Sequence, residues 1–137
     1  MHSTLGFLFV NTAFQAKQNL TALFQKEGFD TTIDQFVVMG ALIGKDGITQ
    51  KHICQICCKN ESNLARILKG MEDKGLIRRQ KGRDGRSRNV YLSEDGQALF
   101  IVLAPIAEKY MTYVLSDLSD DERSILAKLV LRIREKL

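Results

Sequence analysis

The sequence predicts a mainly α-helical (α+β) fold, in which amphipathic helices accompany one short β-hairpin. Three observations predict it. Apolar residues recur at helical intervals along most of the chain, as in Leu64, Ile67, Leu68 and Met71. Two short runs with strand character, at 76–80 and 89–93, flank a polar loop that contains glycine. The length of 137 residues, with 45% hydrophobic and 26% charged residues, fits one globular domain.

Helical spacing and capping residues predict six helices. Thr32 and Gln35 form a capping-box pair that opens the second helix, and Thr49 caps the third. Asn60 or Ser62 caps the fourth helix, and both alternatives remain open. The six predicted segments are 5–27, 33–43, 49–57, 60–74, 96–115 and 119–137.

Other residues predict where helices end and which faces they bury. Gly75 is typical of the position just after a helix and should end the fourth one. Pro105 should end or kink the fifth helix near its middle, because proline lacks a backbone N–H. In the third helix, we expect Ile53, Ile56 and Cys57 to form the buried face.

Charge is distributed unevenly along the chain. Between Lys45 and Val90 there are twelve Lys/Arg and five Asp/Glu residues, a net charge of +7, whereas the rest of the chain carries −3. A basic middle between mildly acidic flanks is typical of a surface that binds a polyanion. A solvated charged face without a ligand is the alternative explanation of the same charge.

The basic middle also has the elements of a winged helix-turn-helix with a two-stranded wing. A short helix, a tight turn and a second helix form a helix-turn-helix, whose second helix fits the DNA major groove. The basic hairpin beside it is a wing, and an arginine at its tip can enter the minor groove. Asp84 is expected to pair with an arginine and hold the tip in shape. The candidate DNA-binding residues are Thr49, Gln50, Lys51, Asn60, Ser62, Asn63, Arg66, Lys69, Lys81, Arg83, Asp84, Arg86 and Arg88.

This stretch resembles the MarR family of bacterial transcriptional regulators. The residues that carry the resemblance are Thr49-Gln50-Lys51, Met71-Glu72-Asp73-Lys74-Gly75-Leu76-Ile77, Asp84-Gly85-Arg86 and Val90-Tyr91-Leu92-Ser93. The resemblance extends to the flanking helices. It implies one domain over 1–137, with a DNA-binding lobe at about 30–95 and helical dimerisation regions at about 1–28 and 96–137. It also implies a homodimer on a pseudo-palindromic operator, with Arg86 in the minor groove and Asp84 supporting it.

The expected function is that of a sequence-specific, double-stranded DNA-binding transcriptional regulator, acting as a repressor that a small apolar or phenolic effector releases. Aromatic and methionine side chains could line an effector pocket, although such residues more often belong to the core; they are Phe7, Phe14, Phe36, Met39 and Tyr110. An enzyme is not expected, since the sequence has no Ser/His/Asp set, phosphate loop or metal-ligand spacing. No run of about 18 apolar residues occurs, so we expect no membrane span. We also expect no cofactor and a cytoplasmic location.

Three clustered cysteines leave a further possibility open. An odd, clustered count favours a reducing compartment over a disulfide framework. Cys54 and Cys57 are expected to pack as small hydrophobic residues, and Cys58, in the turn, to be the reactive thiol. Basic neighbours, Lys59 among them, would lower a thiol pKa. A redox-responsive regulator of the same fold is therefore one alternative, and a winged-helix module that binds protein or RNA is another.

Overall fold

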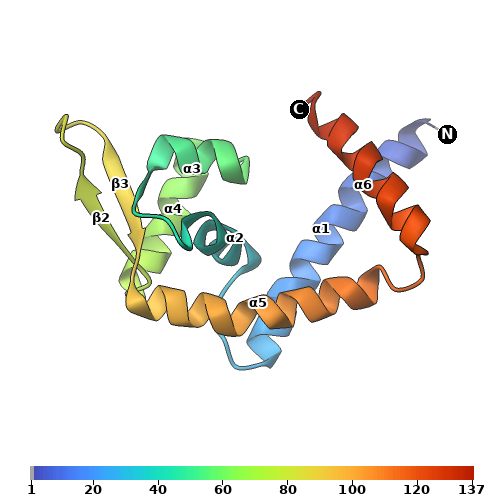
Figure 1. Cartoon of the computed structure of the whole chain (residues 1–137), viewed down its shortest axis with the longest axis horizontal. Helices are drawn as coiled ribbons and strands as arrows, with labels where there is room; N and C mark the ends of the chain where they lie inside the picture. The colour runs from blue at the N-terminus through green and yellow to red at the C-terminus, as the bar shows by residue number, and fades with distance from the viewer. Residues whose placement is uncertain (1) are drawn as a thin grey trace. The chain divides into compact units, whose positions relative to one another are not determined.

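The computed structural model describes residues 2–137, with side chains from residue 4 onward. Its elements are α1 (His2–Lys26), α2 (Ile33–Leu42), β1 (Ile48–Thr49), α3 (Gln50–Cys57), α4 (Glu61–Asp73), β2 (Ile77–Lys81), β3 (Arg88–Leu92), α5 (Glu94–Val114) and α6 (Asp120–Arg134) (Figure 1). The chain divides into two compact units, one up to Ala104 and the other Pro105–Leu137. The mainly helical prediction is confirmed, and each predicted helix is present within a few residues of its expected bounds.

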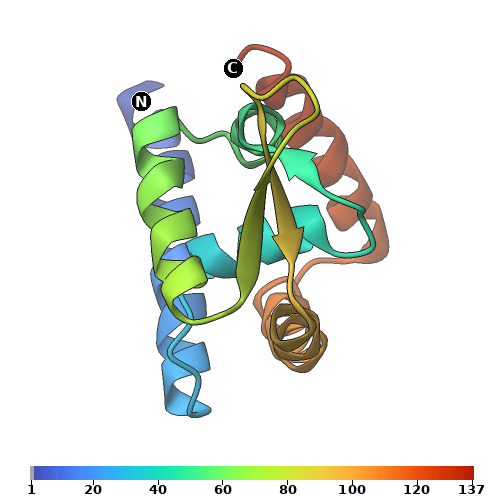
Figure 2. The same ribbon diagram turned by 90° about the vertical axis from the view of Figure 1, so that its left-hand side faces the viewer.

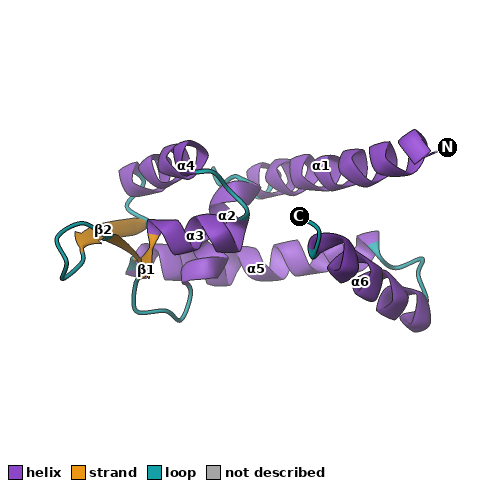
Figure 3. Cartoon of the chain, turned by 90° about the horizontal axis from the view of Figure 1, so that it is seen from above, coloured by secondary structure: helices purple, strands orange, loops and turns teal. Residues whose placement is uncertain are grey.

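The described strands form one antiparallel sheet of three strands in the order β1-β3-β2, beside α3 and α4 (Figure 3). The predicted hairpin is confirmed, since β2 and β3 pair from Ile77 with Leu92 to Lys81 with Arg88. The sheet has one further strand that the sequence did not predict, because β1 pairs with β3 through Ile48 and Val90. Two residues are too few to show an alternating pattern, so only the tertiary pairing reveals this strand. The hairpin lies against α3 and α4 (Figure 2).

The core of the first unit lies where α2, α3, α4 and β3 meet. The inner face of α4 is confirmed at Leu64, Leu68 and Met71, each nearly or fully buried. The predicted inner face of α3 is wrong at Ile56, which is 41% exposed although Ile53 is fully buried. The two residues are about 60° apart around the helix. The face of α3 that carries Cys54 and Cys57 is turned partly inward. Ile56 therefore lies at the edge of the contact between α3 and the core.

The two ends of α4 settle one alternative that the sequence left open and confirm one prediction. Asn60, not Ser62, caps α4, because its side chain accepts a hydrogen bond from the N–H of Asn63. Gly75 ends α4 with a positive φ of 72°, as predicted, and the N–H of Leu76 returns to the carbonyl of Met71.

Pro105 lies inside α5 and does not end it, so that part of the prediction is wrong. A proline removes one backbone hydrogen bond, and the helical bonds on either side continue. The boundary between the two compact units nevertheless falls at this residue.

Two helices carry large apolar side chains on their surface. The exposed residues of α1 are Leu5, Phe7, Leu8, Phe9, Val10 and Phe14, and those of α6 include Ile125, Leu126, Leu129, Val130, Leu131 and Ile133. Exposed apolar faces of this extent are typical of surfaces that another protein surface covers. In the part of the chain that the structure describes, no helix combines the length and apolarity needed to cross a membrane.

The candidate effector-pocket residues differ in burial. Met39 is fully buried, and Phe36 packs in an aromatic cluster, with its ring centroid 5.1 Å from that of Phe100 and 5.4 Å from that of Phe24. Phe7 and Phe14 are exposed on α1. Phe36 and Met39 therefore belong to the core of the first unit.

Candidate nucleic-acid interface

Local sequence positions the helix-turn-helix. Thr49 caps α3, since its hydroxyl accepts a hydrogen bond from the N–H of His52 at 3.2 Å. Cys58 ends α3 in the left-handed conformation, with φ 54°, and so reverses the chain direction. Asn60 then caps α4 through a 2.7 Å bond. The turn between the two helices is thus only three residues long, as the sequence predicts.

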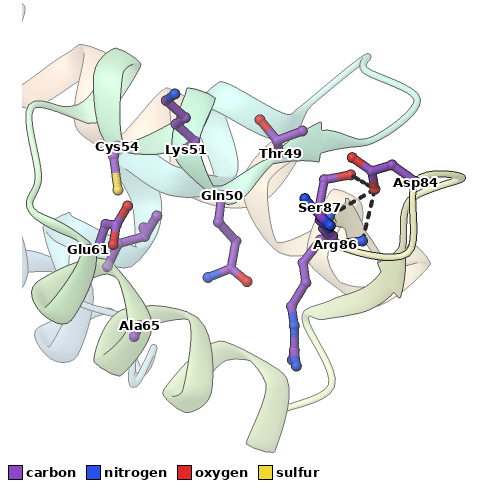
Figure 4. A pocket seen from close by; sticks show the side chains of 11 residues that line it. Thr49, Gln50, Lys51, Cys54, Glu61, Ala65, Asp84, Arg86 and Ser87 are labelled. Carbon is purple, nitrogen blue, oxygen red and sulfur yellow. Dashed lines mark hydrogen bonds between the residues drawn. The ribbon is translucent and has the colours of Figure 1, made fainter.

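A hollow of about 590 Å³ lies between the first turns of α3 and α4 and the wing (Figure 4). It brings together six of the predicted DNA-binding residues: Thr49, Gln50, Lys51, Asp84, Arg86 and Arg88. Figure 4 shows Gln50 and Arg86 extending into the open space above α4. The hollow is therefore lined on one side by a helix N-terminus, which favours anions, and on the other by basic wing residues.

The other predicted residues lie outside this hollow. Ser62, Arg66 and Lys69 are exposed along α4, Asn63 is half-buried there, and Asn60 is its cap. Lys81 ends β2, and Arg83 lies in the wing loop. Five residues outside the predicted DNA-binding set also line the hollow: Cys54, Glu61, Leu64, Ala65 and Ser87. Helical phase places Glu61 and Ala65 together on the outward face of α4, since they are four residues apart.

Asp84 holds the wing tip together. Its Oδ1 accepts hydrogen bonds from the N–H of Arg86 at 3.0 Å and the N–H of Ser87 at 2.9 Å, and from the Ser87 hydroxyl at 2.8 Å. The bond from the Ser87 N–H, then that from Arg86, holds the pKa of Asp84 below its usual value. The expected pairing with an arginine side chain is wrong, because Asp84 binds backbone N–H groups instead. The Arg86 guanidinium is left to reach into the hollow.

Along α4, two basic side chains have acceptors on the same helix. Arg66 donates a long 3.4 Å hydrogen bond from Nη2 to Oδ1 of Asn63. Lys69 forms a 2.9 Å ion pair with Asp73, and this hydrogen bond raises the pKa of Lys69. Both pairs are exposed, so water screens them and they are weak.

The wing is fixed against α4 at its base. Arg79 of β2 lies 3.4 Å from the Glu72 carboxylate, and its side chain is mostly buried. On the other side of β2, the Arg78 guanidinium lies 4.4 Å from the centre of the Tyr91 ring, within cation–π distance. The first contact joins α4 to the hairpin, and the second joins β2 to β3 within it.

A three-residue ion cluster joins α1, α2 and the turn of the helix-turn-helix. Oδ1 of Asp34 lies 2.7 Å from Nζ of Lys59 and 3.0 Å from Nζ of Lys17. Burial raises the pKa of Asp34, but the hydrogen bonds from Lys59 and Lys17 outweigh burial and lower the pKa below its usual value. Lys59 immediately precedes the cap of α4, so this cluster fixes the start of α4 to α2.

The cysteines differ in their surroundings. Cys58 is exposed, while Cys54 and Cys57 are half-buried. Burial raises the pKa of Cys57, and the nearby Lys59 only partly opposes this. The raised pKa agrees with the expectation that Cys57 packs as a small hydrophobic residue rather than as a reactive thiol. In the described part of the chain, no group of three or more His, Cys, Asp or Glu residues could hold a metal ion.

Known proteins resemble this chain in sequence and in structure. A sequence model of the MarR family matches residues 29–87. Transcriptional regulator HosA of Escherichia coli O157:H7 is 33% identical over 117 residues, which cover 85% of this chain and 87% of HosA. The Staphylococcus aureus MepR–DNA complex has a TM-score of 0.87 at 24% identity, covering 96% of this chain and 97% of MepR. PcaV of Streptomyces coelicolor, solved with its natural ligand, has a TM-score of 0.79 at 21% identity, covering 90% of this chain and 89% of PcaV.

Proposed function

The chain belongs to the MarR family and is a DNA-binding transcriptional regulator, and from this premise we propose that it is a repressor released from its operator by a small ligand. The hollow between α3, α4 and the wing is the observation that supports a DNA-binding surface at this place. There the N-terminus of α3, the exposed side of α4 and the Arg86 guanidinium border the same open space (Figure 4).

Each side of this surface suits a different part of duplex DNA. Thr49, Gln50 and Lys51 at the start of α3 suit phosphates, which set the position of the protein without reading sequence. Ser62, Asn63 and Arg66 on α4 suit base edges in the major groove. Lys69, Lys81, Arg83 and Arg88 add positive charge beside them. Arg86, on the tip that Asp84 orders, suits the minor groove.

We further propose a homodimer on a pseudo-palindromic operator. The exposed apolar faces of α1 and α6 support this, because large apolar side chains are seldom left in contact with water. In this arrangement the DNA-binding lobe consists of residues from about 30 to 95. The dimerisation regions consist of residues from about 1 to 28 and from about 96 to 137. Two recognition helices related by a two-fold axis would bind half-sites about 34–36 Å apart, one turn of DNA.

The ligand proposed is small and apolar or phenolic. PcaV, a protein of the same fold, was solved with its natural ligand. A ligand releases the repressor if it binds more tightly to a dimer whose recognition helices do not match the half-site spacing. We propose that this regulator acts in the cytoplasm and has no catalytic activity. Family membership favours DNA over protein or RNA as the partner, and the raised pKa of Cys57 does not support a redox switch at that thiol.

Selection of bound sites from a random duplex pool tests the proposal. We expect the selected sites to share a motif with two-fold symmetry. The logarithm of the association constant should fall linearly with the logarithm of the salt concentration, at a slope of about −0.9 per phosphate neutralised. Salt-insensitive binding, or no preference for duplex over single strands, would refute the DNA-binding surface. Addition of small phenolic acids to the complex then tests for release.

Three variants test the assignment of residues. Arg86→Ala should weaken operator binding about tenfold without changing the fold, since one good arginine contact supplies roughly 1–3 kcal/mol. Lys26→Ala, an exposed lysine at the end of α1, is the control and should bind as the unmodified protein does. Arg66→Ala should change the base preference. A loss that is uniform over all sequences would mean that Arg66 contacts phosphate only.

A further inference from the structure

Glu61 is an acidic residue at the centre of the proposed DNA-binding surface. It is the first residue of α4, is exposed, and lines the hollow beside the wing. Figure 4 shows its carboxylate directed toward α3, where the sulfur of Cys54 lies opposite. Ala65, one turn further along α4, lines the same hollow and has only a methyl group, so it leaves the space beside Glu61 open.

The Glu61 carboxylate has no partner side chain within the described structure. Of the two acidic residues that line the hollow, Asp84 accepts three hydrogen bonds within the wing tip. Among residues 4–137, Glu61 has neither a hydrogen bond nor an ion pair between side chains, although Lys51 and Arg86 line the same hollow. An exposed carboxylate without a partner side chain therefore borders the hollow that we propose for a polyanion.

The chemistry of a carboxylate limits what it can bind there. It only accepts hydrogen bonds, so it is repelled by phosphates and by the N7 and O6 acceptors of guanine. In the major groove, amino groups are presented by cytosine N4 and adenine N6. Adenine presents its amino group beside the N7 acceptor, whereas cytosine presents no acceptor on that edge. A carboxylate accordingly fits cytosine best.

We propose that Glu61 is a specificity-determining residue, which accepts a hydrogen bond from the N4 amino group of one cytosine in each half-site and disfavours DNA without it. This inference rests on the proposed DNA-binding surface. Glu61 contributes selectivity at the expense of affinity, because its charge repels the phosphates of every sequence equally and is compensated only where the cytosine is present.

A carboxylate in the first turn also stabilises a helix through the helix dipole, so the experiment must separate the two roles. Glu94 provides the matched control, because it is likewise exposed and is the first residue of its helix, α5, but does not line the hollow. The unmodified protein, Glu61→Gln, Glu61→Ala, Glu94→Gln and Arg86→Ala are each used to select sites from the same random duplex pool.

Glu61→Gln should change the preferred base from cytosine to adenine at one position of each half-site, because an amide binds adenine N6 and N7 together. The preference should change about tenfold at that position, and affinity for random duplex should rise. Glu61→Ala should lose the cytosine preference and gain no other. Glu94→Gln should select the same motif as the unmodified protein.

Unchanged base preferences in both Glu61 variants, with the same change of affinity on every sequence, would overturn the inference. A separate result, the affinity of Arg86→Ala, tests the proposed DNA-binding surface. If Arg86→Ala binds as tightly as the unmodified protein, the DNA-binding surface itself is wrongly placed. If Arg86→Ala binds more weakly while both Glu61 variants keep the cytosine, only the role of Glu61 is refuted.

Discussion

Replacement of Asp34 by Asn removes the charge that two lysines share while keeping the size of the side chain. Lys59 is the more important partner, since its side chain is only 13% exposed and its Nζ lies 2.7 Å from Oδ1 of Asp34. A hydrogen bond between charged groups of this kind contributes about 1.5 kcal/mol. Lys17 is 47% exposed, so screening by water reduces its pair to about 0.5 kcal/mol. Asp34→Asn should therefore lower the free energy of unfolding by about 2 kcal/mol.

Urea unfolding between pH 7 and pH 3 measures this effect, at one fixed protein concentration so that association contributes equally. The lysines hold the pKa of Asp34 below its usual value. Stability from such a group is fully present above the unfolded pKa of about 3.9 and is lost as the pH falls through the lower folded pKa. The difference between Asp34→Asn and the unmodified protein should be constant from pH 7 to pH 5 and decrease below about pH 4.

Asp121→Asn is the control for charge at a helix N-terminus. Asp34 and Asp121 are each the second residue of their helix, but Asp121 is exposed and has no ion pair within residues 4–137. The control should lose only the helix-dipole contribution of about 0.5 kcal/mol. Equal losses for the two variants, or a loss for Asp34→Asn that does not change with pH, would refute the reasoning.

Three more substitutions have defined outcomes. Asp84→Ala should weaken operator binding several-fold at an unchanged melting temperature, because it removes three hydrogen bonds that order an exposed tip; equal affinity would contradict this. Leu68→Ala should cost about 3 kcal/mol in urea unfolding, since Leu68 is fully buried; a cost below about 1 kcal/mol would contradict it. Gly47→Ala should cost about 1–2 kcal/mol, because φ is 88° and the added carbon would lie 2.6 Å from the Tyr91 ring; unchanged stability would argue against this strain.

The helices of the chain could be predicted because their signals are local. Thr32 and Gln35 make the predicted capping box, and the side chain of Thr49 caps α3 as expected. The apolar residues of α4 recur at the helical period, so Leu64 and Leu68 could be assigned to the core without a structure. The type of site followed from the same local order of short helix, turn, helix and basic hairpin.

The features that the sequence did not reveal depend on packing between segments or on the conformation of a loop. Strand β1 exists only because Ile48 meets Val90, 42 residues later. Exposure of Ile56 depends on how α3 is rotated against its neighbours, which a pattern of eight residues does not specify. Asp84 was expected to bind an arginine side chain, but the conformation of the loop brings two backbone N–H groups closer.

The amino-acid sequence by itself determined the helices, the hairpin and the positive charge of the segment from Lys45 to Val90, because capping, periodicity and composition act over a few residues. Only the tertiary structure decided which of these residues meet. It brought Thr49, Arg86 and Glu61 to one hollow from three separate segments, and it joined Asp34 to lysines on two other segments. The physical reason is that distances across the fold follow from the packing of whole helices, in which each buried side chain restricts the positions of all its neighbours.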